Sequence, residues 1–273
     1  MMDKRDIPVL KVEGKTLPEA WEKAVLTTWE EGITIRTEYD REGDPPSKDC
    51  TMIIVIREPL TEPRIHRAFP GGLDDLEVYR QEVIKGVHDH WIKPEEGKWT
   101  YTYHQRLFAY EMGGERIDQI NYIIAKLSKV PYSRRAQAVT WNVCLDPPTD
   151  DPPCLQRLFC RISRNKEGKA VLNMNTHWRS RDGYKAASMN LFAFTDLQRL
   201  IAGKIAERRG EEVLVGRHVD ITDSFHIYGS YYQEFENFLK TVKKRSFAER
   251  TWSTEDAEPF FEEGRKRLAA EKK

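Results

Sequence analysis

The residues of this chain that could do covalent chemistry centre on one cysteine, Cys154, which follows Pro152-Pro153. A cysteine is a nucleophile as its thiolate, and neighbouring cations stabilise that form. Arginines lie on both sides of it in the sequence, in Ser133-Arg134-Arg135 and in Trp178-Arg179-Ser180-Arg181-Asp182. A guanidinium group also binds phosphate through its planar fork of donors. These residue types together predict nucleophilic attack on a phosphorylated small molecule.

A side-chain amide and a His/Tyr pair, Asn190 and His226-Ile227-Tyr228, complete this set. An amide donates and accepts hydrogen bonds at once, as the edge of a nucleobase requires. Each residue alone has a simpler explanation: Asn190 could cap the helix that follows it, and Cys154 could be an inert buried thiol. Arg41, in a polar loop, could contact an anion or be solvated. Glu82 could be a buried acid or lie on the solvent-exposed face of its helix.

The composition excludes some classes of function. Lysine plus arginine number 44 and aspartate plus glutamate 44, so no overall field favours nucleic acid or a membrane. The four cysteines have no metal-ligand spacing, so we expect no bound metal. No signal peptide or long apolar run is apparent, so the expected location is cytoplasmic, with the cysteines reduced and no structural disulfide.

Periodicity predicts the elements that must position these residues. We expect helices from the start of the chain to about Glu31 and at 76–87, 117–127, 190–207 and through Phe235 and Leu239. We expect strands at 51–57, 136–141, 155–162, 170–178 and 213–221. Helices and strands alternate without a regular βαβ rhythm, which favours one α/β domain over 1–273 with a mixed sheet. The segment 250–273 is predicted to be a charged C-terminal tail.

From Ile117 to about Phe238 the chain resembles thymidylate synthase of the folate-dependent kind. The motifs occur in the order of that family: Ile117-Asp118-Gln119-Ile120, Ser133-Arg134-Arg135, Trp141-Asn142, Pro153-Cys154, Arg179-Ser180-x-Asp182, Asn190 and His226-x-Tyr228. The resemblance implies a three-layer α/β (α+β) fold whose sheets pack together in a homodimer, with 117–238 as the motif-bearing core.

The resemblance also implies a role for each residue in reductive methylation of dUMP to dTMP. Cys154 would add to C6 of the pyrimidine, so that C5 takes a one-carbon unit from 5,10-methylenetetrahydrofolate or a modified pterin. Asn190 would read O4 and N3–H, and Asp182 would order water beside the folate. The remaining assignments are Arg179, Ser180 and Arg41 for the phosphate, Arg134 and Arg135 for the phosphate of the neighbouring subunit, His226 and Tyr228 for the sugar, and Glu82 and Tyr103 for proton relay.

Some features depart from the common form of the family. Leu155 after the nucleophile and Tyr101-Thr102-Tyr103 before Arg106 resemble its archaeal-type branch. The apolar C-terminus of the family has no counterpart in 265–273, and Trp91 or Trp99 could stand in for the tryptophans of its folate pocket. Three alternatives therefore stay open: a hydroxymethylase acting on dUMP, CMP or dCMP, a non-catalytic nucleotide-binding relative and, more weakly, a cysteine protease.

Overall fold

The computed structural model describes residues 6–271. Its main sheet consists of β1 (Val9–Gly14), β2 (Ile33–Ile35), β3 (Ser47–Ile56), β7 (Gln137–Val139), β8 (Leu155–Arg164), β9 (Ala170–Asp182) and β10 (Val213–Ile227). The strand order is β1-β3-β10-β9-β8-β7, with β2 also paired to β3. β1 is parallel to β3 and β10 is parallel to β9, whereas the other pairs are antiparallel. The predicted mixed sheet of an α/β fold is confirmed.

The helices are α1 (Leu17–Glu31), α2 (Leu73–Lys85), α3 (Tyr103–Phe108), α4 (Gln119–Lys129), α5 (Ala187–Arg209), α6 (Tyr232–Lys244) and α7 (Thr254–Glu271). Two short strand pairs lie outside the main sheet, β4 (Ile65–His66) with β11 (Thr251–Trp252) and β5 (Tyr110–Met112) with β6 (Glu115–Ile117). No helix of the described chain is long and apolar enough to span a bilayer.

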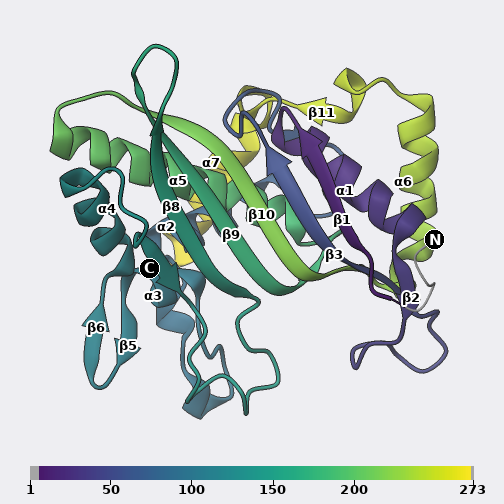
Figure 1. The fold of residues 1–273 in the computed structure, drawn as a ribbon. Helices are drawn as coiled ribbons and strands as arrows, with labels where there is room; N and C mark the ends of the chain where they lie inside the picture. The colour runs from purple at the N-terminus through teal and green to yellow at the C-terminus, as the bar shows by residue number, and fades with distance from the viewer. Residues whose placement is uncertain (1–5, 272–273) are drawn as a thin grey trace.

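The elements form three layers (Figure 1). α1 and α5 pack on one face of the sheet, α2 packs on α5, and α7 packs on α2. α5 is the core helix that its apolar sequence predicted, since Leu191, Phe194 and Leu197 on it are buried. Its residues belong to both clusters of buried apolar side chains, so it joins them. The organisation of 1–273 as one domain stays a prediction.

The second face of the sheet looks toward the viewer in Figure 1, and no helix of residues 6–271 covers it. Along β9 the buried side chains alternate with partly exposed ones such as Asn175 and His177. On the neighbouring strands some of the partly exposed side chains are apolar, for example Phe159 on β8 and Ile221 on β10. A face of this kind can be covered by another chain, so the predicted packing of two sheets stays a prediction.

The N-terminal segment differs from its prediction as a helix. Residues 9–14 form β1, an edge strand paired to β3, and α1 begins only at Leu17. In β1 Val12 and Gly14 are buried, whereas Lys11 and Glu13 are exposed, which is the alternation of a half-buried strand. Residues 1–5 of the predicted helix lie outside the described residues.

The prediction of a charged tail at 250–273 is wrong for the residues that the structure describes. α7 buries Ala257, Phe261 and Leu268 at helical spacing, and it lies against α2. Its exposed charges pair with that helix, since Arg267 contacts Asp74 at 2.7 Å. The segment therefore consists of β11 and an amphipathic helix of the third layer, and residues 272–273 are outside the described range.

Candidate active site

The predicted nucleophile lies where two strands of the sheet meet. Cys154 directly precedes β8, and its carbonyl accepts a hydrogen bond of 2.8 Å from the backbone N–H of Arg179 in β9. The parallel register of β9 and β10 sets Asp182 beside His226. Ser180, which is half-buried, lies between Arg179 and Asp182 on the same strand. Residues far apart in the sequence thus gather at one end of the sheet.

The guanidinium group of Arg179 holds the segment that presents Cys154. Its Nη2 donates to the carbonyl of Pro152 at 2.7 Å, and its Nε donates to the carbonyl of Pro153 at 3.2 Å. These acceptors are neutral, so they leave the positive charge of Arg179 uncompensated. An arginine in this state beside a thiol can still bind a phosphate.

The thiol of Cys154 is half-buried, and this burial raises its pKa. Arg179 opposes the rise, Asp151 adds to it, and Arg181 opposes it weakly. Arg181 is a weak influence because it is itself buried in an ion pair with Asp220. Arg179 therefore favours the thiolate, as predicted of a neighbouring cation, but burial outweighs it and the pKa of Cys154 is raised.

We expect alkylation of Cys154 by iodoacetamide to rise with pH, with a midpoint above the usual range of a cysteine thiol, because only the thiolate reacts. Arg179→Gln should move the midpoint further up, since it removes the main cation that lowers this pKa. Mass spectrometry of the peptide containing Cys154 gives the rate at each pH, and Arg116→Gln, on an exposed hairpin, is the control. A midpoint below the usual range, or one that Arg179→Gln lowers, would contradict this account.

Asn190 lies in the first turns of α5 and is buried, and its amide is held by a residue that the sequence did not single out. Its Nδ2 donates to the hydroxyl of Tyr79 on α2 at 2.7 Å. Burial places the pKa of Tyr79 well above its usual value, so the hydroxyl stays neutral. Tyr79 precedes Glu82 by one helical turn, a spacing that puts both on one face of α2. The amide of Asn190 is thereby fixed in orientation.

The ring of His226 is buried and packs edge-on against Tyr228, with 4.6 Å between ring centroids. Nδ1 lies 3.2 Å from the carbonyl of Ser224, so it carries the proton in the neutral ring. Burial lowers the pKa of His226 to about 4, which keeps the ring neutral at neutral pH. Nε2 is buried without a hydrogen-bond partner among the described residues. An unpaired buried acceptor is costly, so this nitrogen fits a hydroxyl donated by a ligand.

Asp182 stabilises a backbone turn, a structural role in addition to the predicted one. Its carboxylate accepts hydrogen bonds from the backbone N–H groups of Tyr184, at 3.0 Å, and Lys185, at 2.8 Å. Burial raises its pKa to about 6, and these two bonds partly oppose the rise. The carboxylate therefore shapes the turn between β9 and α5, which sets the position of Asn190.

The loop 36–46 lies close to this end of the sheet and brings two further side chains. Burial and Glu38 raise the pKa of Tyr39, and the charge of Arg179 partly opposes that rise. Burial likewise raises the pKa of Tyr231, and Arg41 partly opposes it. Arg41 is exposed. The loop thus places Arg41 and Tyr39 within electrostatic reach of the Arg179 end of the site.

Arg134 and Arg135 are not brought to the other predicted residues of the same chain. Both are exposed in the turn before β7, where the carbonyl of Ala136 accepts a bond from the N–H of Cys160. Cys160 and Cys154 are separated along β8 by roughly 20 Å, at about 3.3 Å per residue. A phosphate beside Cys154 is therefore out of their reach within one subunit.

A cavity of about 660 Å³ adjoins the nucleophile and is lined by Glu82, Trp99, Tyr101, Tyr103 and Asp151, among others. The hydroxyl of Tyr103 accepts a hydrogen bond of 3.3 Å from the backbone N–H of Leu155, directly after Cys154. Trp91 lines a neighbouring hollow that shares Trp99. Aromatic faces with carboxylates at the edge suit a planar heterocycle that carries N–H donors. Among residues 6–271 no cluster of side chains could hold a metal ion.

The comparison with protein families gives one match, to the model described as "Thymidylate synthase", over residues 72–262. This range covers most of the chain and includes α2, the nucleophile, the arginines of β9 and the first half of α7. The chain belongs to the thymidylate synthase family.

Curated relatives carry the same family name. A protein of Methanosarcina acetivorans named "Putative thymidylate synthase" is 29% identical over 89% of this chain and 100% of its own length. A protein of Methanopyrus kandleri with the same name is 30% identical over 74% of this chain and 86% of its own length. These relatives are archaeal, in agreement with the archaeal-type features of the sequence.

Solved structures confirm the fold of the thymidylate synthase family. Thermostable thymidylate synthase A from Bacillus subtilis superposes with a TM-score of 0.59, over 82% of this chain and 84% of that chain, at 20% sequence identity. A likeness at this identity shows the fold, and the chemistry must be argued from the residues of this chain.

Proposed function

We propose that the protein transfers a one-carbon unit to C5 of a pyrimidine nucleotide, in a reductive methylation of dUMP to dTMP. The observation that carries the proposal is the convergence of Cys154, the free charge of Arg179 and the unpartnered Nε2 of His226 at one end of the sheet. These are a nucleophile, a phosphate ligand and an acceptor for a sugar hydroxyl, which a nucleotide satisfies together.

The covalent step assigned to Cys154 follows from the chemistry of uracil. Its C5–C6 double bond is conjugated to the C4 carbonyl, so sulfur can add at C6 and leave electron density on C5 and O4. Burial raises the pKa of the thiol, which makes the thiolate more basic and hence a stronger nucleophile once formed. Elimination of the same sulfur ends the reaction, so Cys154 is regenerated.

Recognition of the base would depend on Asn190. With Nδ2 turned to the hydroxyl of Tyr79, its Oδ1 is free to accept N3–H, and the second hydrogen of Nδ2 can donate to O4. This pattern matches uracil. Arg179, Ser180 and Arg41 would bind the 5′-phosphate, and Tyr228 would assist His226 at the 3′-hydroxyl.

The cavity beside Cys154 fits a reduced folate or a modified pterin. Trp99, Tyr101 and Tyr103 offer aromatic faces, and Glu82 and Asp151 offer acceptors for pterin N–H groups. When bound, the co-substrate supplies the one-carbon unit and, for methylation, the hydride. Glu82 and Tyr103 would handle the protons that the base gains and loses at this boundary.

The distance from Arg134 and Arg135 to Cys154 supports a homodimer with shared sites. Both arginines are exposed and out of reach of the phosphate in their own subunit, yet a second copy packed on the bare face of the sheet could present them to it. Guanidinium groups from two chains would then surround one phosphate.

Covalent capture of 5-fluorodeoxyuridylate tests the proposed function. Fluorine at C5 cannot leave as a proton does, so the adduct of Cys154, nucleotide and methylenetetrahydrofolate should accumulate and survive denaturation, and mass spectrometry detects it. The adduct should form only when both compounds are present and should map to the peptide containing Cys154. A protein that binds the nucleotide without an adduct would be a non-catalytic relative.

Hydroxymethylation of a pyrimidine nucleotide is the second candidate, and one observation favours it. The cavity is lined by carboxylates, and Trp99 in its lining is 41% exposed, so water can enter the cavity. Water rather than hydride would then complete the transfer. The mass of the nucleotide product separates the two reactions, and dUMP, dCMP and CMP are the substrates to compare.

A further inference from the structure

His88 connects Glu82, at the cavity, to the end of the C-terminal helix. Its Nδ1 lies 3.0 Å from Oε2 of Glu82, and its Nε2 lies 3.3 Å from Oε2 of Glu271. The ring stacks on Trp91 with 3.8 Å between centroids and an angle of 8° between planes. The side chain of His88 is 5% exposed, that of Glu82 12% and that of Glu271 35%. The imidazole is therefore fixed between two carboxylates.

The chemistry of these groups determines where the protons lie. An ionised carboxylate only accepts hydrogen bonds, so the outer and more exposed Glu271 requires a proton on Nε2. With Nε2 committed as a donor, Nδ1 is the nitrogen that can release or take up a proton. It faces Glu82, so one proton can lie on Nδ1 or on Oε2 of Glu82. The orientation of a histidine by a carboxylate on its far nitrogen is a known means of fixing its tautomer.

We propose that Glu271, His88 and Glu82 form a proton relay in which the C-terminal helix supplies the positioning carboxylate of the active site. Glu271 holds His88 as the Nε2–H tautomer, and His88 exchanges a proton between its Nδ1 and Glu82. When Glu82 gives its proton to the bound base, the Nδ1 proton of doubly protonated His88 can replace it; when Glu82 takes a proton from the base, neutral Nδ1 can accept that proton from Glu82. This proposal rests on the proposed function, since it gives Glu82 its partner in that reaction.

The surroundings of Glu82 support such an exchange. Burial raises its pKa, the bond to His88 partly opposes the rise, and Asp89 adds to it. Asp89 is itself held by Thr102 at 2.5 Å and His104 at 2.6 Å. The other titratable side chains around Glu82 and His88 are Tyr79 on α2, Tyr101 and Tyr103, and Lys98, Asp150 and Asp151 at the cavity.

Substitutions of Glu271 and His88 in the full chain test the relay through turnover of dUMP. Glu271→Ala should lower kcat by about fivefold to tenfold and leave KM for dUMP unchanged, whereas Glu271→Gln, which keeps an acceptor for Nε2–H, should recover most of kcat. His88→Phe keeps a ring on Trp91 but removes both nitrogens. It should lower kcat further and move the limb of the kcat–pH profile that Glu82 controls to higher pH, because the bond that lowers the pKa of Glu82 is lost. Glu263→Ala, an exposed glutamate of α7, is the matched control.

A second measurement separates this inference from the proposed function. In long-range ¹H–¹⁵N spectra the Nε2 signal of His88, assigned by its loss in His88→Phe, should shift in Glu271→Ala and stay unchanged in Glu263→Ala. If the signal does not move, or if Glu271→Ala lowers the melting temperature without changing kcat, the relay is wrong. If the unsubstituted protein turns over no nucleotide, the proposed function fails, and the Nε2 signal still decides whether Glu271 orients His88.

Discussion

Cys154→Ser is expected to lower turnover of dUMP by about a thousandfold or more, because a serine hydroxyl without an adjacent base is far less ionised than a thiol. The substitution replaces one sulfur atom by a smaller oxygen and touches none of the nucleotide ligands, so binding of dUMP should change by less than about threefold. Tritium release from 5-tritiated deoxyuridylate measures turnover, and calorimetric titration with dUMP measures binding.

The position of a second thiol supplies the control for this prediction. Cys144 is exposed and lines a different hollow, with Tyr110 and Trp141, so Cys144→Ser should leave turnover unchanged. Retention of even a tenth of the turnover in Cys154→Ser would remove Cys154 from the mechanism. Loss of dUMP binding in that variant would instead show that the thiol has a structural role in the pocket.

The candidate site could be predicted from the sequence only where a residue type is unusual for its surroundings. Cys154 between a proline pair and a strand, and Arg179 in a strand, stand out in this way. Tyr79 does not, because nothing in the sequence of a surface-like helix indicates a contact with Asn190, more than a hundred residues later. The role of His88 is hidden for the same reason, since nothing in the sequence links it to Glu82 or to Glu271, 183 residues later.

Two arginines of the same motif show what a sequence cannot separate. Arg179 and Arg181 lie two residues apart in β9, and both count as cations near Cys154. Arg181 is buried in an ion pair with Asp220, whose Oδ2 also accepts from Nε1 of Trp178 at 2.8 Å. Arg179 instead bonds only to neutral carbonyls among the described residues and keeps its charge free. Arg181 is structural because Asp220 of β10 pairs with it, whereas Arg179 has no such carboxylate among the described residues and can bind a ligand.

The sequence predicts an element where its apolar residues form a long run or a regular pattern, and it fails where charged residues interrupt that pattern. β9 alternates over most of its length, and α5 is recognisable by its long apolar run, so the predicted ranges of both lie close to the observed bounds. In β1 the exposed residues Val9, Lys11 and Glu13 alternate with more buried ones. This pattern is too short to be recognised beside the helical pattern that follows it. In α7 the buried residues Ala257 and Phe261 are four apart, but most residues around them are charged, and this composition is typical of an unstructured tail.

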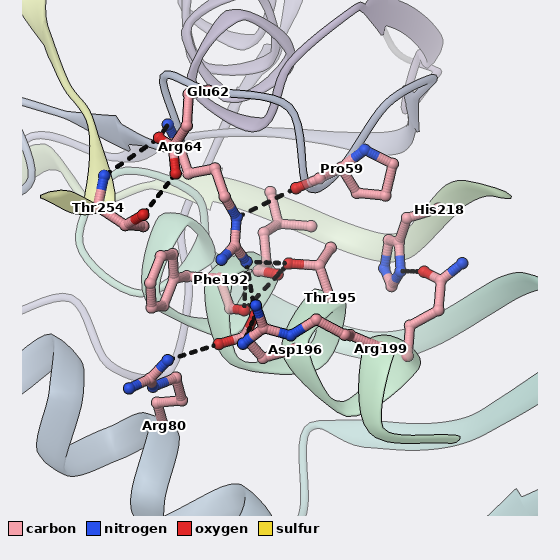
Figure 2. Close-up of polar contacts among 12 residues, drawn as sticks. Pro59, Glu62, Arg64, Arg80, Phe192, Thr195, Asp196, Arg199, His218 and Thr254 are labelled. Carbon is pink, nitrogen blue, oxygen red and sulfur yellow. Dashed lines mark hydrogen bonds and ion pairs between the residues drawn. The ribbon is translucent and has the colours of Figure 1, made fainter. Parts of the chain in front are cut away.

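A buried ion cluster between α2 and α5 leads to the prediction with the largest expected effect on stability (Figure 2). Asp196 of α5 is fully buried, and it pairs with Arg64 at 3.0 Å, with Arg80 at 3.0 Å and with Arg199 at 3.2 Å. Arg64 is 4% exposed and also donates to Thr195 at 3.0 Å. Burial lowers the pKa of Arg64, and Asp196 opposes this by stabilising its charge. Asp196 is thus the counter-charge of a buried guanidinium group.

Asp196→Ala is expected to lower the free energy of unfolding by about 3–5 kcal/mol, because it leaves the charge of Arg64 buried and uncompensated. Arg199→Ala removes an arginine from the same carboxylate, but its side chain is 54% exposed, so the loss should be about 0–1 kcal/mol. Urea denaturation followed by circular dichroism measures both. Adding Arg64→Met to Asp196→Ala should restore part of the lost stability, since it removes the uncompensated charge. If the double variant is less stable than Asp196→Ala alone, packing of Arg64 on the ring of Phe192, 4.4 Å away, matters more than its charge.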